Sequence, residues 1–133
     1  MSKTIAFVTN QHRCDRLISA AYKLSDKTGS ELMVVGVLDC EYVLDPKAVD
    51  YLFMKSKEYK ATMRLLFTDD KIDAMREITA QFDAQRIITG MPQSHSSVVY
   101  DLWREFSDKS FYTVDSGGEL VEVATKPMQT YTA

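Results

Sequence analysis

The sequence lacks the long apolar run that a membrane-spanning helix needs, and it contains only two cysteines. No apolar stretch approaches the ~20 residues required to cross a bilayer, so we expect no membrane partner. Cys14 and Cys40 match neither a metal-binding nor a redox spacing, which is typical of reduced thiols. Lys3 leads directly into a strand-like run, without the pattern of a signal peptide. These absences together predict a cytoplasmic protein.

The chain also lacks an excess of positive charge. Its 133 residues contain 16 Lys and Arg against 19 Asp and Glu, which gives a net charge of −3. Nucleic-acid-binding proteins normally carry a basic excess or stripe, so we expect no nucleic-acid partner. Internal repeats, linkers and low-complexity tracts are absent from the sequence. The length suits a single domain over residues 1–133, with a core over 2–115 and a C-terminal hairpin strand and tail over 116–133.

Short apolar runs alternate with segments of helical periodicity along the chain. The apolar runs cover residues 4–8, 31–38, 61–67, 87–88 and 111–114. The first of them lacks polar alternation, which is typical of a strand buried on both faces. Apolar side chains three or four residues apart predict helices that begin near residues 14, 45, 68 and 98. Strands that alternate with helices predict an open, mostly parallel α/β sheet.

The predicted helix that begins at Asp45 and Pro46 has an apolar and a basic side. Its inner face is expected to consist of Val49, Leu52, Phe53 and Ser56. Its lysines, at positions 47, 55, 57 and 60, are spread around the helix, which favours a solvated face over a phosphate-binding patch.

The stretch Gln85–Phe106 carries the functional hypothesis. It consists of a strand that stops at Gly90, a polar loop rich in hydroxyl groups, and a helix whose inner face is formed by Val98, Val99, Leu102, Trp103 and Phe106. Glycine permits backbone torsions that other residues avoid, and the first N–H groups of a helix have no partners within it. Such a connection can hold an anion or a nucleotide. Alternatively, Ser96 or Ser97 serves only as the N-cap of the helix.

The order and spacing of these segments resemble the universal stress protein family over roughly residues 2–114. That family opens with a strand, a helix of type A-L-x-x-A-x-x-L-A and the pattern G-A-x-L-x-x-x-x-V, which correspond to Leu17–Leu24 and Gly29–Val37. Its fourth strand, A-D-L-I-V-M-G, corresponds to Ala84–Gly90. The resemblance implies the strand order 3-2-1-4-5. We therefore predict a three-layer α/β fold with a mostly parallel five-stranded sheet, helices on both faces and a C-terminal antiparallel hairpin strand.

This strand order would place the loops after the first and fourth strands opposite each other. The predicted ligand-binding residues follow those two strands: Thr9, Asn10 and His12 on one side, and Gly90, Gln93, Ser94, His95, Ser96 and Ser97 on the other. ATP-binding members of the family carry G-x2-G-x9-G-[S/T] after the fourth strand and an aspartate at the end of the first. The corresponding positions are Gly90, Gln93, Trp103 and Arg104, and Thr9 or Asn10 replaces the aspartate. Loss of the later glycines blocks the family's close approach of backbone to phosphate, although the replacement loop is rich in donors.

Enzyme motifs of related α/β folds, H-x-G-H, S-G-G-x-D-[S/T] and G-x-S-x-G, do not occur. Cys14 with His12 or His95 as base would form a catalytic pair, but no third group to orient the base is indicated. We therefore expect a small stress-associated or regulatory binding protein that holds a nucleotide or another anion, with ATP or AMP as candidates. The alternative is an interaction module without a small-molecule site, which acts by dimerising or by docking to a partner.

The C-terminal segment predicts an assembly. Asp115–Gly118 reads as a turn, and residues 119–123 alternate like a half-exposed strand. Val121 and Val123 would lie on one face, with Leu120 and Glu122 on the other. The resemblance places the preceding strand at the sheet edge, which the hairpin either covers within one chain or extends towards a second copy. Because both strand faces carry an apolar residue, we predict a symmetric homodimer built around these strands.

Overall fold

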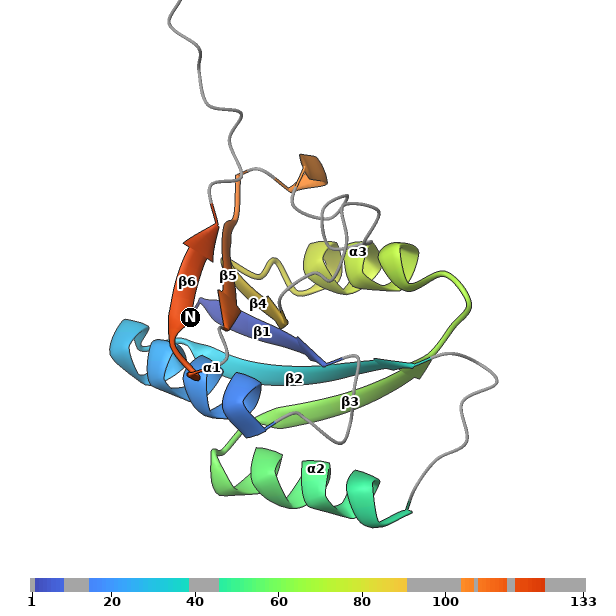
Figure 1. Ribbon diagram of the computed structural model, residues 1–133. Helices are drawn as coiled ribbons and strands as arrows, with labels where there is room; N and C mark the ends of the chain where they lie inside the picture. The colour runs from blue at the N-terminus through green and yellow to red at the C-terminus, as the bar shows by residue number, and fades with distance from the viewer. Residues whose placement is uncertain are drawn as a thin grey trace, which may run out of the picture.

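The computed structural model describes residues 2–8, 15–38, 46–90, 104–106, 108–114 and 117–123. The elements follow in the order β1 (Lys3–Val8), α1 (Asp15–Thr28), β2 (Glu31–Leu38), α2 (Pro46–Glu58), β3 (Thr62–Phe67), α3 (Lys71–Gln81), β4 (Arg86–Gly90), β5 (Ser110–Val114) and β6 (Leu120–Val123). The described strands form one sheet in the order β3-β2-β1-β4-β5-β6 (Figure 1). Strands β1 to β5 are parallel and β6 is antiparallel to β5. The predicted strand order and sheet type are therefore confirmed.

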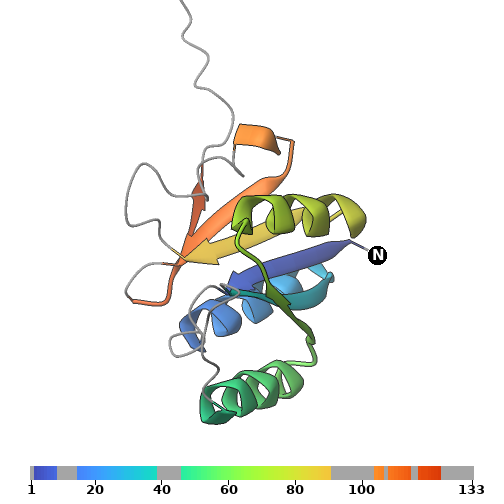
Figure 2. The ribbon, with the colours of Figure 1, turned by 90° about the vertical axis from the view of Figure 1, so that its right-hand side faces the viewer.

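The sheet separates two layers of helices. Figures 1 and 2 show α1 and α2 on one side of the sheet and α3 on the other. Alternate side chains of β1 serve the two sides, since Ile5 and Phe7 pack with residues of α3 whereas Ala6 and Val8 pack with residues of α1. A strand with both faces covered must be apolar throughout, which explains the unbroken apolar run. The expected three-layer arrangement is confirmed.

Two helix ends are explained by the chemistry of neighbouring residues. Asp70 caps α3, because its Oδ1 accepts a hydrogen bond of 3.1 Å from the backbone N–H of Asp73. Gly29 follows α1 with a φ of +65°, the left-handed conformation expected of a helix C-cap, and its N–H donates to the carbonyl of Asp26. Both ends are determined by a few neighbouring residues.

Helix α2 departs from the predicted pattern. Leu52 and Ser56 are buried as expected, but Phe53 is 48% exposed instead of lying on the inner face. The reason is the position of α2 beside β3, the last strand on this side of the sheet. At the edge of a sheet, the strands extend under only part of a helix. The apolar side of α2 is wider than the sheet surface beneath it, so some of its apolar side chains stay exposed. The prediction for Phe53 is wrong.

The C-terminal hairpin closes within the chain. Val114 pairs with Leu120 and Phe111 pairs with Val123, so β6 covers the outer edge of β5. Leu120 packs on the α1 side and Val123 on the α3 side, as the alternation predicts, whereas Val121 is 46% exposed. The predicted helix over residues 98–106 lies mostly outside the described residues, apart from Arg104 and Glu105, which are helical. Within the described part of the chain, no helix combines the length and apolarity of a membrane span.

Candidate ligand site at the carboxyl ends of β1 and β4

Strands β1 and β4 lie side by side at the centre of the sheet. Ala6 of β1 is in register with Ile88 of β4, and the two strands are parallel. From β1 the chain continues through α1 to β2 on one side, and from β4 it continues to β5 on the other. In open α/β sheets, ligands bind beyond the carboxyl ends of two neighbouring strands whose connections leave in opposite directions.

The predicted site residues belong to the two segments that leave this point. Continuing the register by two residues places Val8, the end of β1, beside Gly90, the end of β4. Gly90 is thus at the carboxyl edge, as predicted. The remaining predicted residues, Thr9, Asn10, His12, Gln93, Ser94, His95, Ser96 and Ser97, lie outside the described residues, as do Cys14 and Cys40.

Two buried threonines lie at the same edge and were not predicted as site residues. Thr89 and Thr113 are opposite each other in the β4–β5 ladder, and each is 2% exposed. The Oγ1 atom of Thr89 has no hydrogen-bond partner among the described residues. A buried hydroxyl without a partner costs about 1–3 kcal/mol, so this atom is a candidate donor to a ligand. The signal in the sequence is a hydroxyl residue between an apolar run and Gly90.

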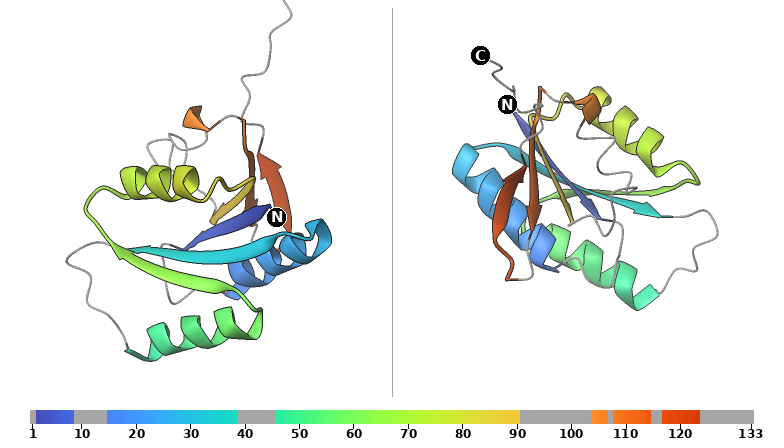
Figure 3. Two further views of the ribbon diagram at one scale, coloured as in Figure 1. Left: turned by 180° about the vertical axis from the view of Figure 1, so that it is seen from behind. Right: turned by 45° about the horizontal axis from the view of Figure 1, so that its top comes forward.

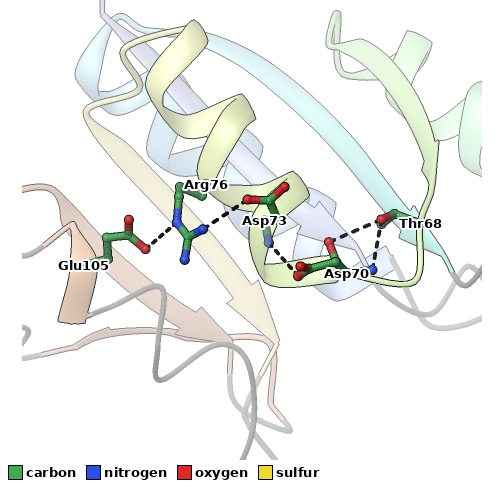
Figure 4. Close-up of polar contacts among 5 residues, drawn as sticks. All are labelled: Thr68, Asp70, Asp73, Arg76 and Glu105. Atoms are coloured by element: carbon green, nitrogen blue, oxygen red, sulfur yellow. Dashed lines mark hydrogen bonds and ion pairs between the residues drawn. The ribbon is translucent and has the colours of Figure 1, made fainter.

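Two ion pairs hold the chain that enters β5. Arg76 of α3 donates from Nε to Oε2 of Glu105 over 2.6 Å, and from Nη1 to Oδ1 of Asp73 over 3.1 Å (Figure 4). The hydrogen bond that Arg76 donates to Glu105 raises the pKa of Arg76 above its ordinary value. Lys109 donates to Oδ1 of Asp83 over 2.8 Å, and this hydrogen bond lowers the pKa of Asp83.

These contacts bear on the candidate site because Glu105 and Lys109 follow the segment 91–103. The return of the chain from the candidate loop to the sheet is therefore fixed to α3 and to the turn before β4.

A groove of about 390 Å³ runs beside the start of α1 and the turn between β5 and β6. Cations and carboxylates both line it: Arg16, Lys23 and Lys55, and Asp15 and Glu119. Tyr51 donates a hydrogen bond of 2.6 Å to Asp15 at its border. The mixture of charges gives this groove no preference for anions. The described residues contain no group of three or more His, Cys, Asp and Glu side chains arranged to hold a metal ion.

Comparison with solved structures shows what kind of fold this is. A protein of the universal stress protein family from Burkholderia pseudomallei superposes with a TM-score of 0.61 at 16% sequence identity, over 85% of this chain and 95% of the other. A universal stress protein from Archaeoglobus fulgidus superposes with a TM-score of 0.62 at 12% identity, over 86% and 94%. The chain has the universal stress protein fold.

The same fold comparison includes a protein of a different kind. The zinc-inhibited form of the teicoplanin deacetylase Orf2 superposes with a TM-score of 0.60 at 9% identity, over 84% of this chain and 67% of that one. No family model and no curated protein matches the sequence. The universal stress protein fold is therefore confirmed by structure, and function has to be argued from the site.

Proposed function

We propose that this chain is a small cytoplasmic, stress-associated or regulatory protein that binds a nucleotide or another anion between the carboxyl ends of β1 and β4. The observation that carries the proposal is the adjacency of these two strands at the point where strand order reverses. Two segments rich in hydrogen-bond donors leave the sheet at that point, after Val8 and after Gly90.

The proposed roles follow from the chemistry of each residue type. Gly90 lets the backbone approach the ligand, and Ser94, Ser96 and Ser97 offer hydroxyl donors before the helix that the sequence predicts over residues 98–106. His95 and Gln93 add side-chain donors in the same segment. Thr9, Asn10 and His12 bind from the opposite segment. ATP and AMP are the first ligands to test, because the resemblance to universal stress proteins includes ATP-binding members.

Thermal unfolding in the presence of ATP, AMP, cyclic nucleotides and inorganic phosphate tests the proposal. A ligand that binds only the folded chain adds about 2.7 kcal/mol at 100 times its dissociation constant, which raises the Tm. The double variant Ser96→Ala with His95→Ala should lose the shift. A matched control is Ser19→Ala, which removes a hydroxyl from α1. If no compound raises the Tm, or if the double variant keeps the full shift, the site is elsewhere.

The second proposal is an interaction module that assembles as a symmetric homodimer around the C-terminal hairpin. It is supported by β6, the last strand on its side of the sheet, and by Val121, an apolar side chain that is 46% exposed there. Native mass spectrometry separates the two proposals. A retained small molecule supports the ligand site, and a dimer mass without an adduct supports the interaction module.

A further inference from the structure

A groove of about 480 Å³ lies at the β3 edge of the sheet, between the end of α2 and the start of β3. Seen from behind in Figure 3, β3 is the outermost strand on this side and α2 lies beside it. The volume is within the range of roughly 300–1,000 Å³ that small-molecule sites occupy. Because α2 ends and β3 begins here, the groove is at the amino ends of the parallel strands. The candidate crevice of β1 and β4 is at their carboxyl ends.

The groove has an apolar wall. Phe53 and Met54 of α2 line it together with Ala61 and Met63 at the start of β3. Phe53 is 48% exposed and Met54 is 58% exposed. Single exposed apolar residues are common on protein surfaces, but two large ones that share a groove with a further methionine form a contiguous apolar surface. This surface is suited to an aliphatic or aromatic group.

A buried hydroxyl also lines the groove. Ser56 is 1% exposed, and its Oγ has no hydrogen-bond partner among the described residues. A serine inside a helix usually satisfies its hydroxyl with water or with the carbonyl four residues earlier. Ser56 forms no such bond to a carbonyl among the described residues, so a small movement of the wall would let this hydroxyl bind an acceptor in the groove.

Two lysines give the groove a positive charge. Lys57 and Lys60 line it three residues apart, and within the described residues neither forms an ion pair, whereas the neighbouring Lys55 is 3.4 Å from Glu58. Lys60 has a φ of +57°, and its N–H donates to the carbonyl of Lys57 over 3.0 Å. This left-handed residue ends the helix and turns the chain back, so that Lys60 and Ala61 border the same groove.

We propose that the groove binds a small apolar carboxylate. An acyl or aryl group would lie against Phe53, Met54 and Met63, and the carboxylate would lie between the ammonium groups of Lys57 and Lys60. Charge decides the class of ligand, because two lysines border a largely apolar surface and, among the described residues, no carboxylate lines it. The site is independent of the nucleotide proposal, since it is formed by other residues at the opposite ends of the strands.

Calorimetric titration with three ten-carbon compounds below their micelle concentrations tests the class of ligand. Decanoate should bind at one site per chain, decanol about tenfold more weakly because it lacks the charge, and decyltrimethylammonium not at all. Amide chemical-shift changes on adding decanoate should centre on residues 53–63. Equal affinity for decanoate and decanol, or shift changes centred elsewhere, would overturn the proposal.

Charge-matched variants identify the two lysines. Lys57→Gln with Lys60→Asn should remove the preference for decanoate over decanol while decanol still binds; asparagine is chosen because it tolerates the left-handed backbone of Lys60. The control, Lys23→Gln with Lys27→Gln, removes the same charge from exposed positions of α1 and should keep the preference. A preference that survives in the first variant contradicts the proposal.

Met54→Glu should abolish binding of both decanoate and decanol, because it places a carboxylate on the apolar wall. Met54 is exposed, so the variant should fold normally. Sedimentation of the wild-type protein and of this variant tests the alternative that a second copy of the chain occupies the groove. If the wild-type protein self-associates, Met54→Glu disperses it, and decanoate binds neither protein, the groove is a contact between copies and the carboxylate proposal is wrong.

Discussion

The Nε atom of Arg76 lies 2.6 Å from Oε2 of Glu105 and connects α3 to the chain just before β5 (Figure 4). The same guanidinium contacts Asp73, whose backbone N–H is bound by the capping carboxylate of Asp70. Consecutive polar contacts thus join the start of α3 to Glu105, which lies shortly before β5 in the sequence. The ion pair therefore fixes the chain at Glu105 to α3.

The contribution of this ion pair should be small and sensitive to salt. Glu105→Gln removes the charge, and because both side chains are partly exposed, the Tm should fall slightly at low ionic strength. The difference from the wild-type protein should shrink in 1 M salt, where charges are screened over about 3 Å. The control is Glu77→Gln, which removes an exposed carboxylate from α3, the helix that contains Arg76. Equal Tm values for the two variants would show that the ion pair does not stabilise the protein.

The contact between Lys109 and Asp83 predicts a pH dependence. The pKa of Asp83 is lowered in the folded chain, so the unfolded chain binds its proton more readily. The stabilisation is therefore present above the ordinary aspartate pKa of about 3.9 and is lost as the pH falls through the lower, folded value. Asp83→Asn should lower the Tm at neutral pH and have no effect in strong acid. Asparagine also tolerates the φ of +47° at this position.

Asp50→Asn, at an exposed position of α2, controls for the change in net charge. A difference between wild type and Asp83→Asn that stays constant from neutral to strongly acidic pH would show that the contact is not responsible.

Substitutions of two buried threonines distinguish an effect on stability from an effect on ligand binding. The hydroxyls of Thr89 and Thr79 are both buried without partners in the described part of the chain. Valine keeps the shape and removes the unsatisfied group, so each Thr→Val variant should be as stable as the wild-type protein or more stable by roughly 1 kcal/mol in urea denaturation. Under the proposed function, only Thr89→Val should weaken the Tm shift caused by a ligand. Loss of stability in Thr89→Val would instead reveal a structural hydrogen bond.

Gly36 of β2 leaves room for a side chain of the edge strand. A Cβ at this position would lie 2.7 Å from Cδ2 of Leu65, so Leu65 would have to move. Gly36→Ala should therefore destabilise the protein by about 1 kcal/mol, at the low end for overpacking, because Leu65 is only partly buried and its terminal carbon can move. Leu65→Val removes the contacting carbon, and the double variant should be more stable than the sum of the two single changes predicts. Strict additivity in urea denaturation would exclude this contact as the cause.

The dimer proposal predicts that one charge at β6 disperses the assembly. Val121→Lys places an ammonium group at an exposed position of the outermost strand, where lysine disfavours pairing with another chain. Light scattering should give a dimer mass for the wild-type protein and a monomer mass for the variant. Met54→Lys is the control at the opposite edge. A monomeric wild-type protein, or a dimer that persists in Val121→Lys, contradicts an interface at the hairpin.

Much of the fold could be predicted from local patterns. The unbroken apolar runs of β1 and β2 require cover on both faces, and the Asp70 cap and the Gly29 turn depend on residues a few positions apart. Of the candidate site, only Gly90 could be placed, at the end of β4. Thr89 was missed because a hydroxyl in a strand gives no sign of whether a neighbour will satisfy it.

Among the described residues, the sequence by itself determined which segments become strands and helices, because periodicity and capping are properties of neighbouring residues. Only the tertiary structure decided the contacts between distant segments: the ion pair of Arg76 with Glu105, and the pairing of β6 with β5 in the same chain. It also decided that Phe53, on the apolar side of α2, is exposed beside Lys57 and Lys60. The sequence of a helix sets which side of it is apolar. How much of that side is covered depends on where the sheet ends, and the strand order decides that.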